Sequence, residues 1–180
     1  GITVKDLKKL YLEPTLVEEK LREQIGDRDY PTTDNFTHAQ VQALLVNGSD
    51  NATQMKTRWE NGEAFGALSS DSAVASYLRD FASDNTTANW VAEGIKGDAF
   101  DGYAFSATPG VISDPIQDSD DAGKYWVIRV VTREWRPLTE SDRTTLIGDA
   151  YDKWLAEAKE SKDNKIVYYL DKKGGAAKLK

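Results

Sequence analysis

The chain of 180 residues contains no cysteine, one methionine and one histidine. Without cysteine it has no disulfide framework, no thiolate nucleophile and no cysteine-ligated metal. This absence is compatible with a reducing cytosol and equally with a bacterial envelope protein built without disulfides. The histidine, His38, has no Ser or Cys partner at a recognisable spacing, so we expect a solvent-exposed or capping role for it.

Long apolar runs and basic clusters are also missing. No window approaches the roughly 20 apolar residues that span a bilayer, and no basic-then-apolar leader opens the chain. The sequence begins at Gly1, within one turn of a helical pattern, which leaves room for a leader or anchor upstream. The net charge of -7 and the pI of about 4.8 disfavour a nucleic-acid partner, because phosphate binding needs a basic face.

Apolar spacing predicts a helical arm at each end of the chain. Residues 3–25 have the near-heptad spacing of a helix, which Pro14 should kink or split because proline removes a backbone donor. Thr139 and the acids after it predict the start of a second helix that continues to about residue 160. The broad apolar face of this second helix needs a partner, and we expect it to pack on the first helix.

Between the arms, a mixture of strand and helix patterns predicts a separate domain. The expected elements are a strand at 41–46, helices at 51–61 and 63–70, a further helix at 73–81 and a final strand at 123–130.

The segment 26–35 carries Asp, Pro and Thr-Thr and is typical of a linker. We therefore predict an N-terminal helical arm at 1–31, a central domain at 36–135, and a C-terminal helical arm and tail at 136–180.

A motif in the second half of the central domain is the most specific feature of the sequence. Residues 90–94 read Trp-Val-Ala-Glu-Gly, and a helix predicted at 98–106 leads into Thr-Pro-Gly at 108–110 and Ser-Asp-Pro-Ile at 113–116. Proline presets such a turn and glycine accepts positive φ, so the helix should stop sharply. The pattern resembles the second half of a parvulin-type (rotamase) peptidyl-prolyl isomerase domain.

The resemblance covers about residues 36 to 135 and implies an α+β fold, a parvulin-like four-stranded antiparallel sheet surrounded by helices. The flanking arms are similar to those of extracytoplasmic foldases of the PrsA and SurA type. The family resemblance therefore implies an extracytoplasmic location, in the cell envelope or secreted.

Parvulins must overcome the X-Pro rotational barrier of roughly 18 to 20 kcal/mol. The resemblance implies an apolar proline pocket beside a polar network of two histidines and an Asp or Cys. Phe100 matches the pocket phenylalanine, and Lys96 stands where a Met is usual. Ala43 occupies the first histidine place; Trp126 occupies the second when Arg129 is aligned with the family's lysine, and a shift of one residue would put Tyr125 there. We therefore predict no catalytic residues and expect histidine-assisted isomerisation to be lost, while weak activity through pocket desolvation stays open.

The expected function is that of a foldase or chaperone domain that binds unfolded or proline-containing polypeptide, with no cofactor and no metal. Two alternatives are an active isomerase with an altered site and a structural subunit that keeps the fold for assembly. The sequence predicts no oligomeric state. The candidate substrate-binding residues are Phe100, Trp90, Lys96, Trp126 and Ala43.

Other polar and aromatic residues receive structural predictions. The segment 118–123 is similar to the opening of an EF-hand, but Ala and Arg129 replace two ligand positions, so we expect a hairpin loop. Asp98 and Asp101 should lie on a helix surface without shared burial. Three tryptophans are predicted to pack in the core: Trp59, Trp135 and Trp154.

Overall fold

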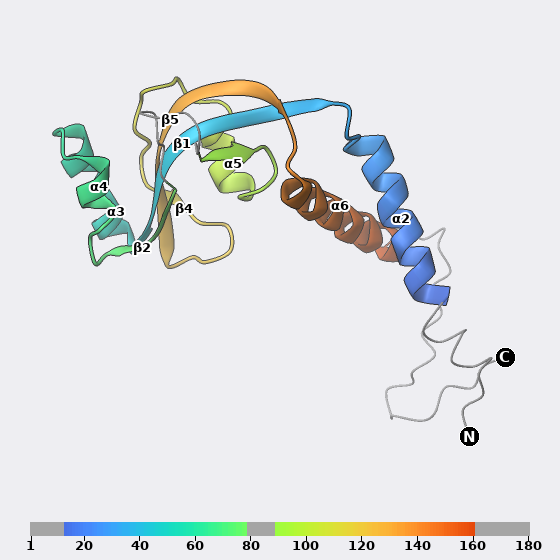
Figure 1. Ribbon diagram of the computed structural model, residues 1–180. Helices are drawn as coiled ribbons and strands as arrows, with labels where there is room; N and C mark the ends of the chain where they lie inside the picture. The colour runs from blue at the N-terminus through green and yellow to red at the C-terminus, as the bar shows by residue number, and fades with distance from the viewer. Residues whose placement is uncertain (1–12, 79–88, 161–180) are drawn as a thin grey trace, which may run out of the picture. The chain divides into compact units, whose positions relative to one another are not determined.

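A computed structural model describes residues 13–78 and 89–160 (Figure 1). The chain divides into two compact units. The sheet unit comprises residues Pro31–Leu146, and the helical unit combines the segments Gly1–Tyr30 and Ile147–Lys180. The boundaries predicted from the sequence, with arms at 1–31 and 136–180 and a central domain at 36–135, stay predictions.

The sheet unit is organised around β1 (Asn35–Asn47) and β5 (Lys124–Pro137), which pair antiparallel from Asn35 opposite Pro137 to Asn47 opposite Lys124. The shorter strands are β2 (Val74–Leu78), β3 (Trp90–Ala92) and β4 (Ile116–Gln117). Within the described residues the sheet thus has five antiparallel strands in the order β2-β1-β5-β4, with β3 also paired to β1. The α+β class with an antiparallel sheet is confirmed, and the predicted count of four strands is corrected to five.

Helices cover both faces of this sheet, with α3 (Ser49–Glu60) and α4 (Phe65–Leu68) on one side and α5 (Asp98–Ala104) on the other (Figure 1). Alternate residues of a strand point to opposite faces. Leu44 and Val127 accordingly pack with α3 and α4, whereas Ala43 and Ile128 pack with α5. We call these two buried groups the α3 cluster and the α5 cluster.

The expected helix at 73–81 is wrong over its described part, where β2 forms instead. Leu78 pairs with Ala43 and Val74 with Val46, so the segment completes the sheet beside β1. Tertiary pairing decides the structure of such a short apolar run, whose periodicity fits either element. Residues 79–81 lie outside the described residues.

The expected exposure of His38 is also wrong. β1 begins at Asn35, so His38 lies inside the sheet, opposite Ala92 on one side and Glu134 on the other. The side chain is buried, and its Nδ1 is 2.8 Å from the carbonyl oxygen of Phe36. Strands on both sides of β1 therefore bury a residue that the sequence placed at a strand start.

The helical unit contains α2 (Glu13–Asp29) and the part of α6 (Glu140–Glu160) that begins at Ile147. Pro14 lies in the first described turn of α2, and the residues before Glu13 lie outside the described ranges, so the kink expected at Pro14 stays a prediction. At the other helix, Thr139 Oγ1 accepts a hydrogen bond of 3.1 Å from the Asp142 amide, which confirms the predicted cap.

The predicted pairing of the arms is confirmed for the described residues. The Arg22 guanidinium lies 4.2 Å from the centre of the Tyr151 ring. Leu21, Ile25 and Trp154 line a common cavity of about 270 Å³. The first turns of the predicted N-terminal helix lie outside the described residues, and none of the described helices is long and apolar enough to cross a membrane.

The prediction that three tryptophans lie in the core holds for Trp59, which is buried in the α3 cluster. It is wrong for Trp135, which is 73% exposed, and for Trp154, which is 42% exposed. On β1 and β5 the α5 cluster ends at Ala39 and Val130, so Trp135 lies beyond it along β5.

Candidate functional site

The candidate residues Phe100, Trp126 and Ala43 meet in the α5 cluster. Phe100 lies in the first turn of α5 and is fully buried, as is Ala43. The ring centres of Phe100 and Trp126 are 5.1 Å apart, with ring planes at 76°. This edge-to-face geometry is favourable for aromatic pairs and fills the space beside Phe100 with the indole.

The strand register relates Ala43 and Trp126 diagonally. Ala43 pairs with Ile128, and Leu45 pairs with Trp126. Ala43 and Trp126 therefore share a sheet face two positions apart, in place of the directly facing pair that the sequence suggested.

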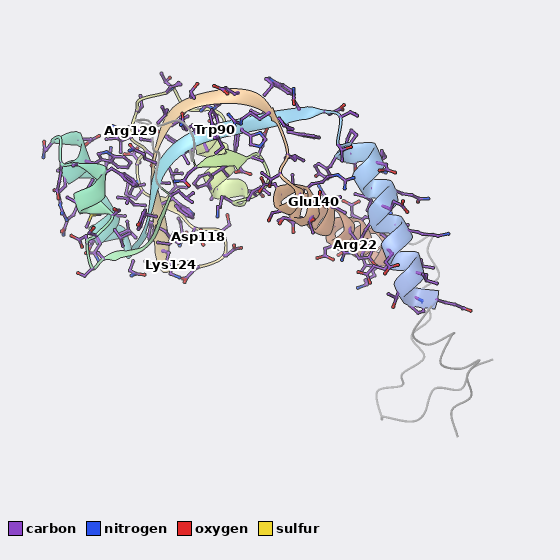
Figure 2. The ribbon with its side chains drawn as sticks, in the orientation of Figure 1. Arg22, Trp90, Asp118, Lys124, Arg129 and Glu140 are labelled. Carbon is purple, nitrogen blue, oxygen red and sulfur yellow. The ribbon has the colours of Figure 1, made fainter. Side chains whose placement is uncertain are left out.

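The Trp126 indole is held by the loop between β4 and β5. Its Nε1 donates a hydrogen bond of 2.6 Å to Asp118 Oδ2, and Asp118 Oδ1 accepts from the amides of Asp120 and Asp121. The segment is a hairpin loop, as predicted, and Asp118 is labelled in Figure 2. Sequence reasoning missed the Asp118–Trp126 bond, although a buried indole N–H usually has an acceptor.

The remaining candidates, Trp90 and Lys96, are half-buried. Val91 belongs to the α5 cluster, so its neighbour Trp90 points to the opposite sheet face. There the Arg136 guanidinium lies 4.3 Å from the centre of a Trp90 ring; Trp90 is labelled in Figure 2. Lys96 lies in the turn between β3 and α5.

The α5 cluster is chemically inert toward proton transfer. Its buried members are aliphatic or aromatic residues. Their one polar side-chain group, the indole N–H of Trp126, donates its hydrogen bond to Asp118. His38 lies five positions before Ala43 on β1, so strand alternation points it to the other face. The cluster therefore offers an apolar surface without an acid, base or nucleophile.

The expectation that Asp101 is a surface carboxylate is wrong. Its Oδ2 accepts a hydrogen bond of 2.7 Å from the Gly94 amide, while its Oδ1 is buried and has no hydrogen-bond partner within the described ranges. Burial raises the pKa of Asp101 to about 6; the Gly94 hydrogen bond opposes this shift, and the negative charges of Glu93 and Asp98 add to it. Asp98 itself is exposed, as expected.

A shallow cavity of about 530 Å³ adjoins this carboxyl. The turn before α5 and the outer side of α5 form its walls, with these residues: Glu93, Gly94, Asp98, Asp101, Gly102, Phe105 and Ser106. Among the residues that the structure describes, no group of three or more His, Cys, Asp and Glu side chains is placed to hold a metal ion. The contact between Asp101 and Gly94 spans seven residues and leaves no signal in helical or strand periodicity.

No family model and no curated protein matches the sequence. Similar solved structures include the peptidylprolyl isomerase PrsA from Bacillus anthracis, with TM-score 0.41, 14% identity, and coverage of 81% of this chain and 62% of that one. PrsA from Bacillus cereus has TM-score 0.46, 18% identity, and coverage of 88% and 59%. The chain thus spans about three fifths of both PrsA structures.

A further similar structure comes from work on the virulence factor PEB4 and the periplasmic protein Cj1289, two structurally related SurA-like chaperones of Campylobacter jejuni. It has TM-score 0.42, 15% identity, and coverage of 91% of this chain and 72% of that one. These structural neighbours carry the names of the foldases and chaperones that the sequence resembles.

Proposed function

We propose that this chain is a parvulin-like, polypeptide-binding domain of an extracytoplasmic foldase or chaperone, in which isomerase activity is weak or lost. The packing of Trp126 against Phe100 carries the proposal. The family resemblance assigns Phe100 to the proline pocket, and the indole occupies the space beside it at a ring-centre distance of 5.1 Å. Two rings at this distance are in contact, so a proline ring cannot enter between them.

The residues at the two histidine positions of the resemblance support the loss of isomerase activity. Ala43 carries no polar side-chain atom, and the indole N–H of Trp126 is bonded to Asp118. An isomerase has to act on a barrier of roughly 18 to 20 kcal/mol that arises from amide resonance. Neither residue can rebuild the polar network that the resemblance implies for an active parvulin.

Binding requires accessible surface, and the accessible candidates in the sheet unit are the half-buried Trp90 and Lys96. Phe100, Trp126 and Ala43 become available to a client only when α5 moves away from the sheet. The helical unit adds exposed apolar side chains at Leu16, Val17 and Trp154. Exposed aliphatic and aromatic groups are suited to the apolar side chains of an unfolded polypeptide.

Chemical-shift mapping with a proline-containing peptide tests the binding half of the proposal. We expect saturable perturbations at Lys96 or at the exposed side chains of the helical unit. Perturbations around Phe100 would locate the client in the α5 cluster. A peptide series that perturbs neither unit would contradict polypeptide binding and favour the assembly alternative.

A further inference from the structure

Trp135 is a large aromatic side chain that the fold leaves in solvent. It lies near the end of β5, is 73% exposed, and belongs to neither the α3 cluster nor the α5 cluster. On β1 its partner is Thr37, and the next pair on the same face is Ala39 with Arg133. Ala39 belongs to the α5 cluster, so Trp135 lies on the α5 face, where the two strands run past α5 (Figure 1). An exposed tryptophan is typical of a binding surface.

The shallow cavity beside α5 begins next to this tryptophan. The carbonyl oxygen of Thr37, opposite Trp135, accepts a hydrogen bond of 3.1 Å from the Glu93 amide. Glu93 forms one wall of the cavity, whose volume is about 530 Å³. The cavity therefore adjoins the sheet at the strand position that carries Trp135.

The far end of the cavity is attached to the same sheet face through Arg133. Its guanidinium donates hydrogen bonds of 2.7 Å to the carbonyl oxygens of Ala104 and Ala107, at the C-terminal end of α5. Phe105 lies between these two residues, lines the cavity and is half-buried. The region thus has two accessible aromatic side chains, Trp135 beside the cavity and Phe105 in its wall.

The charges of the cavity favour a cationic occupant. Its acidic side chains are Glu93, Asp98 and Asp101, and none of them forms an ion pair with another described residue. Burial raises the pKa of Asp101, and the negative charges of Glu93 and Asp98 add to this shift, so the three carboxyl groups act on one another. A cation in the cavity would offset this mutual repulsion. The volume lies within the range of about 300 to 1,000 Å³ that is usual for ligand pockets, which leaves room for a long basic side chain.

We propose that Trp135, Phe105 and the acidic cavity beside α5 form a docking surface for a basic, apolar segment of extended polypeptide. A lysine or arginine side chain of the segment enters the cavity, and a neighbouring arginine or apolar side chain packs on the Trp135 ring. An acidic segment, an anionic bilayer or a second copy of this chain, with its net charge of -7, meets repulsion at the same surface. The inference rests on the proposed polypeptide binding and adds to it a class of client.

An NMR titration of the full chain tests this docking surface. The probe is a peptide in which leucine alternates with arginine, and its two counterparts carry glutamine or glutamate in place of arginine. The arginine peptide should shift the indole N–H signal of Trp135 and the amide signals of Glu93 and Ser106 saturably. The glutamine peptide should bind at least about threefold more weakly, and the glutamate peptide more weakly still. Raising the salt concentration from about 0.05 M to about 0.5 M should weaken binding of the arginine peptide.

Three variants at exposed positions locate the contacts. Trp135→Ala should weaken the affinity for the arginine peptide by about three- to tenfold, because the aromatic anchor is lost. Asp98→Asn should weaken it by about two- to fivefold. The matched control is Glu134→Gln, which removes an exposed carboxylate next to Trp135 in sequence. Glu134 pairs with His38 and faces the other side of the sheet, so the affinity should not change.

The outcomes separate this surface from the proposed function. Shifts confined to Lys96 or to the helical unit would overturn the docking surface and leave polypeptide binding standing. Equal affinity for the arginine and glutamate peptides, or no effect of Trp135→Ala, would also overturn it. Concentration-dependent shifts of Trp135 without peptide would assign the surface to a second copy of the chain and overturn the proposal. No shift with these three peptides or with a proline-containing peptide would contradict polypeptide binding as a whole.

Discussion

Replacing Trp126 with alanine should be among the most destabilising single changes in the sheet unit. The side chain is 7% exposed, packs edge-to-face on Phe100 and donates its indole hydrogen to Asp118. Truncating a buried tryptophan to alanine typically costs about 3 to 5 kcal/mol, since the transfer free energy is lost and a cavity remains. The lost aromatic pairing accounts for about 0.5 to 1.5 kcal/mol within that range.

Trp126→Phe separates packing from hydrogen bonding. It keeps an aromatic ring beside Phe100 and removes the indole N–H that Asp118 accepts. The smaller ring leaves part of the indole volume empty, and loss of the hydrogen bond should cost about 0.5 to 1.5 kcal/mol. We therefore expect Trp126→Phe to lie between wild type and Trp126→Ala.

Urea unfolding followed by far-UV circular dichroism measures both variants, because both remove one of the five tryptophans and so change the fluorescence signal itself. Wild type and variants should unfold with similar dependence on urea, so the midpoints can be compared directly. A loss below about 1 kcal/mol for Trp126→Ala would refute the reasoning, since a surface side chain behaves in that way.

Further predictions concern the backbone, the histidine places and pH. Gly94→Ala should destabilise the protein by about 1 to 3 kcal/mol, because φ is +95° and the new Cβ would push against Leu146 Cδ2. The control is Gly102→Ala, whose glycine lies in a helix and faces open space. It should stabilise the protein by about 0.5 to 1 kcal/mol in the same unfolding assay. Ala43→His should lower the unfolding midpoint by overpacking the fully buried site, and it should leave isomerase activity unrescued while Trp126 fills the partner place; clear activity in this variant would contradict that reading. The pKa of Asp101 is raised to about 6 in the folded state, so its stabilising contribution is present below about pH 4 and is lost as the pH rises through 6. The free energy of unfolding should therefore be measured for wild type and Asp101→Asn at both pH values. Relative to wild type, that of Asp101→Asn should rise by about 1 to 2 kcal/mol from about pH 4 to about pH 7, after allowance for partial exposure. A difference that is the same at both pH values would contradict this prediction.

Elements with strong local signals could be predicted from the sequence. Thr139 and the acids after it gave the start of α6, and Pro109-Gly110 gave the turn in which Gly110 has a φ of +87°. Both depend on residues within a few positions, where backbone geometry and side-chain hydrogen bonds are local.

Burial set by distant strands could not be predicted in the same way. His38 is buried because β3 and β5 flank it, and Asp101 is desolvated where it accepts a hydrogen bond from a turn seven residues earlier. The segment that forms β2 has too few residues for its period to separate strand from helix. Contacts between segments distant in sequence decided the burial of His38, the desolvation of Asp101 and the formation of β2.

At the candidate site, the residue substitutions were visible in the sequence and their packing was not. Ala43 and Trp126 could be placed at the histidine positions of the resemblance, but the diagonal register came from the pairing of Ala43 with Ile128. The bond between Trp126 and Asp118 depends on the hairpin that brings β4 and β5 together.

The central claim, polypeptide binding with weak or lost isomerase activity, is tested most directly by a protease-coupled isomerisation assay on an Ala-Pro test peptide. The same sample should be titrated with a proline-containing peptide by NMR, so that inactive protein is distinguished from misfolded protein. The account predicts saturable binding with little or no acceleration of cis-trans isomerisation. Acceleration comparable to that of an active parvulin would contradict it.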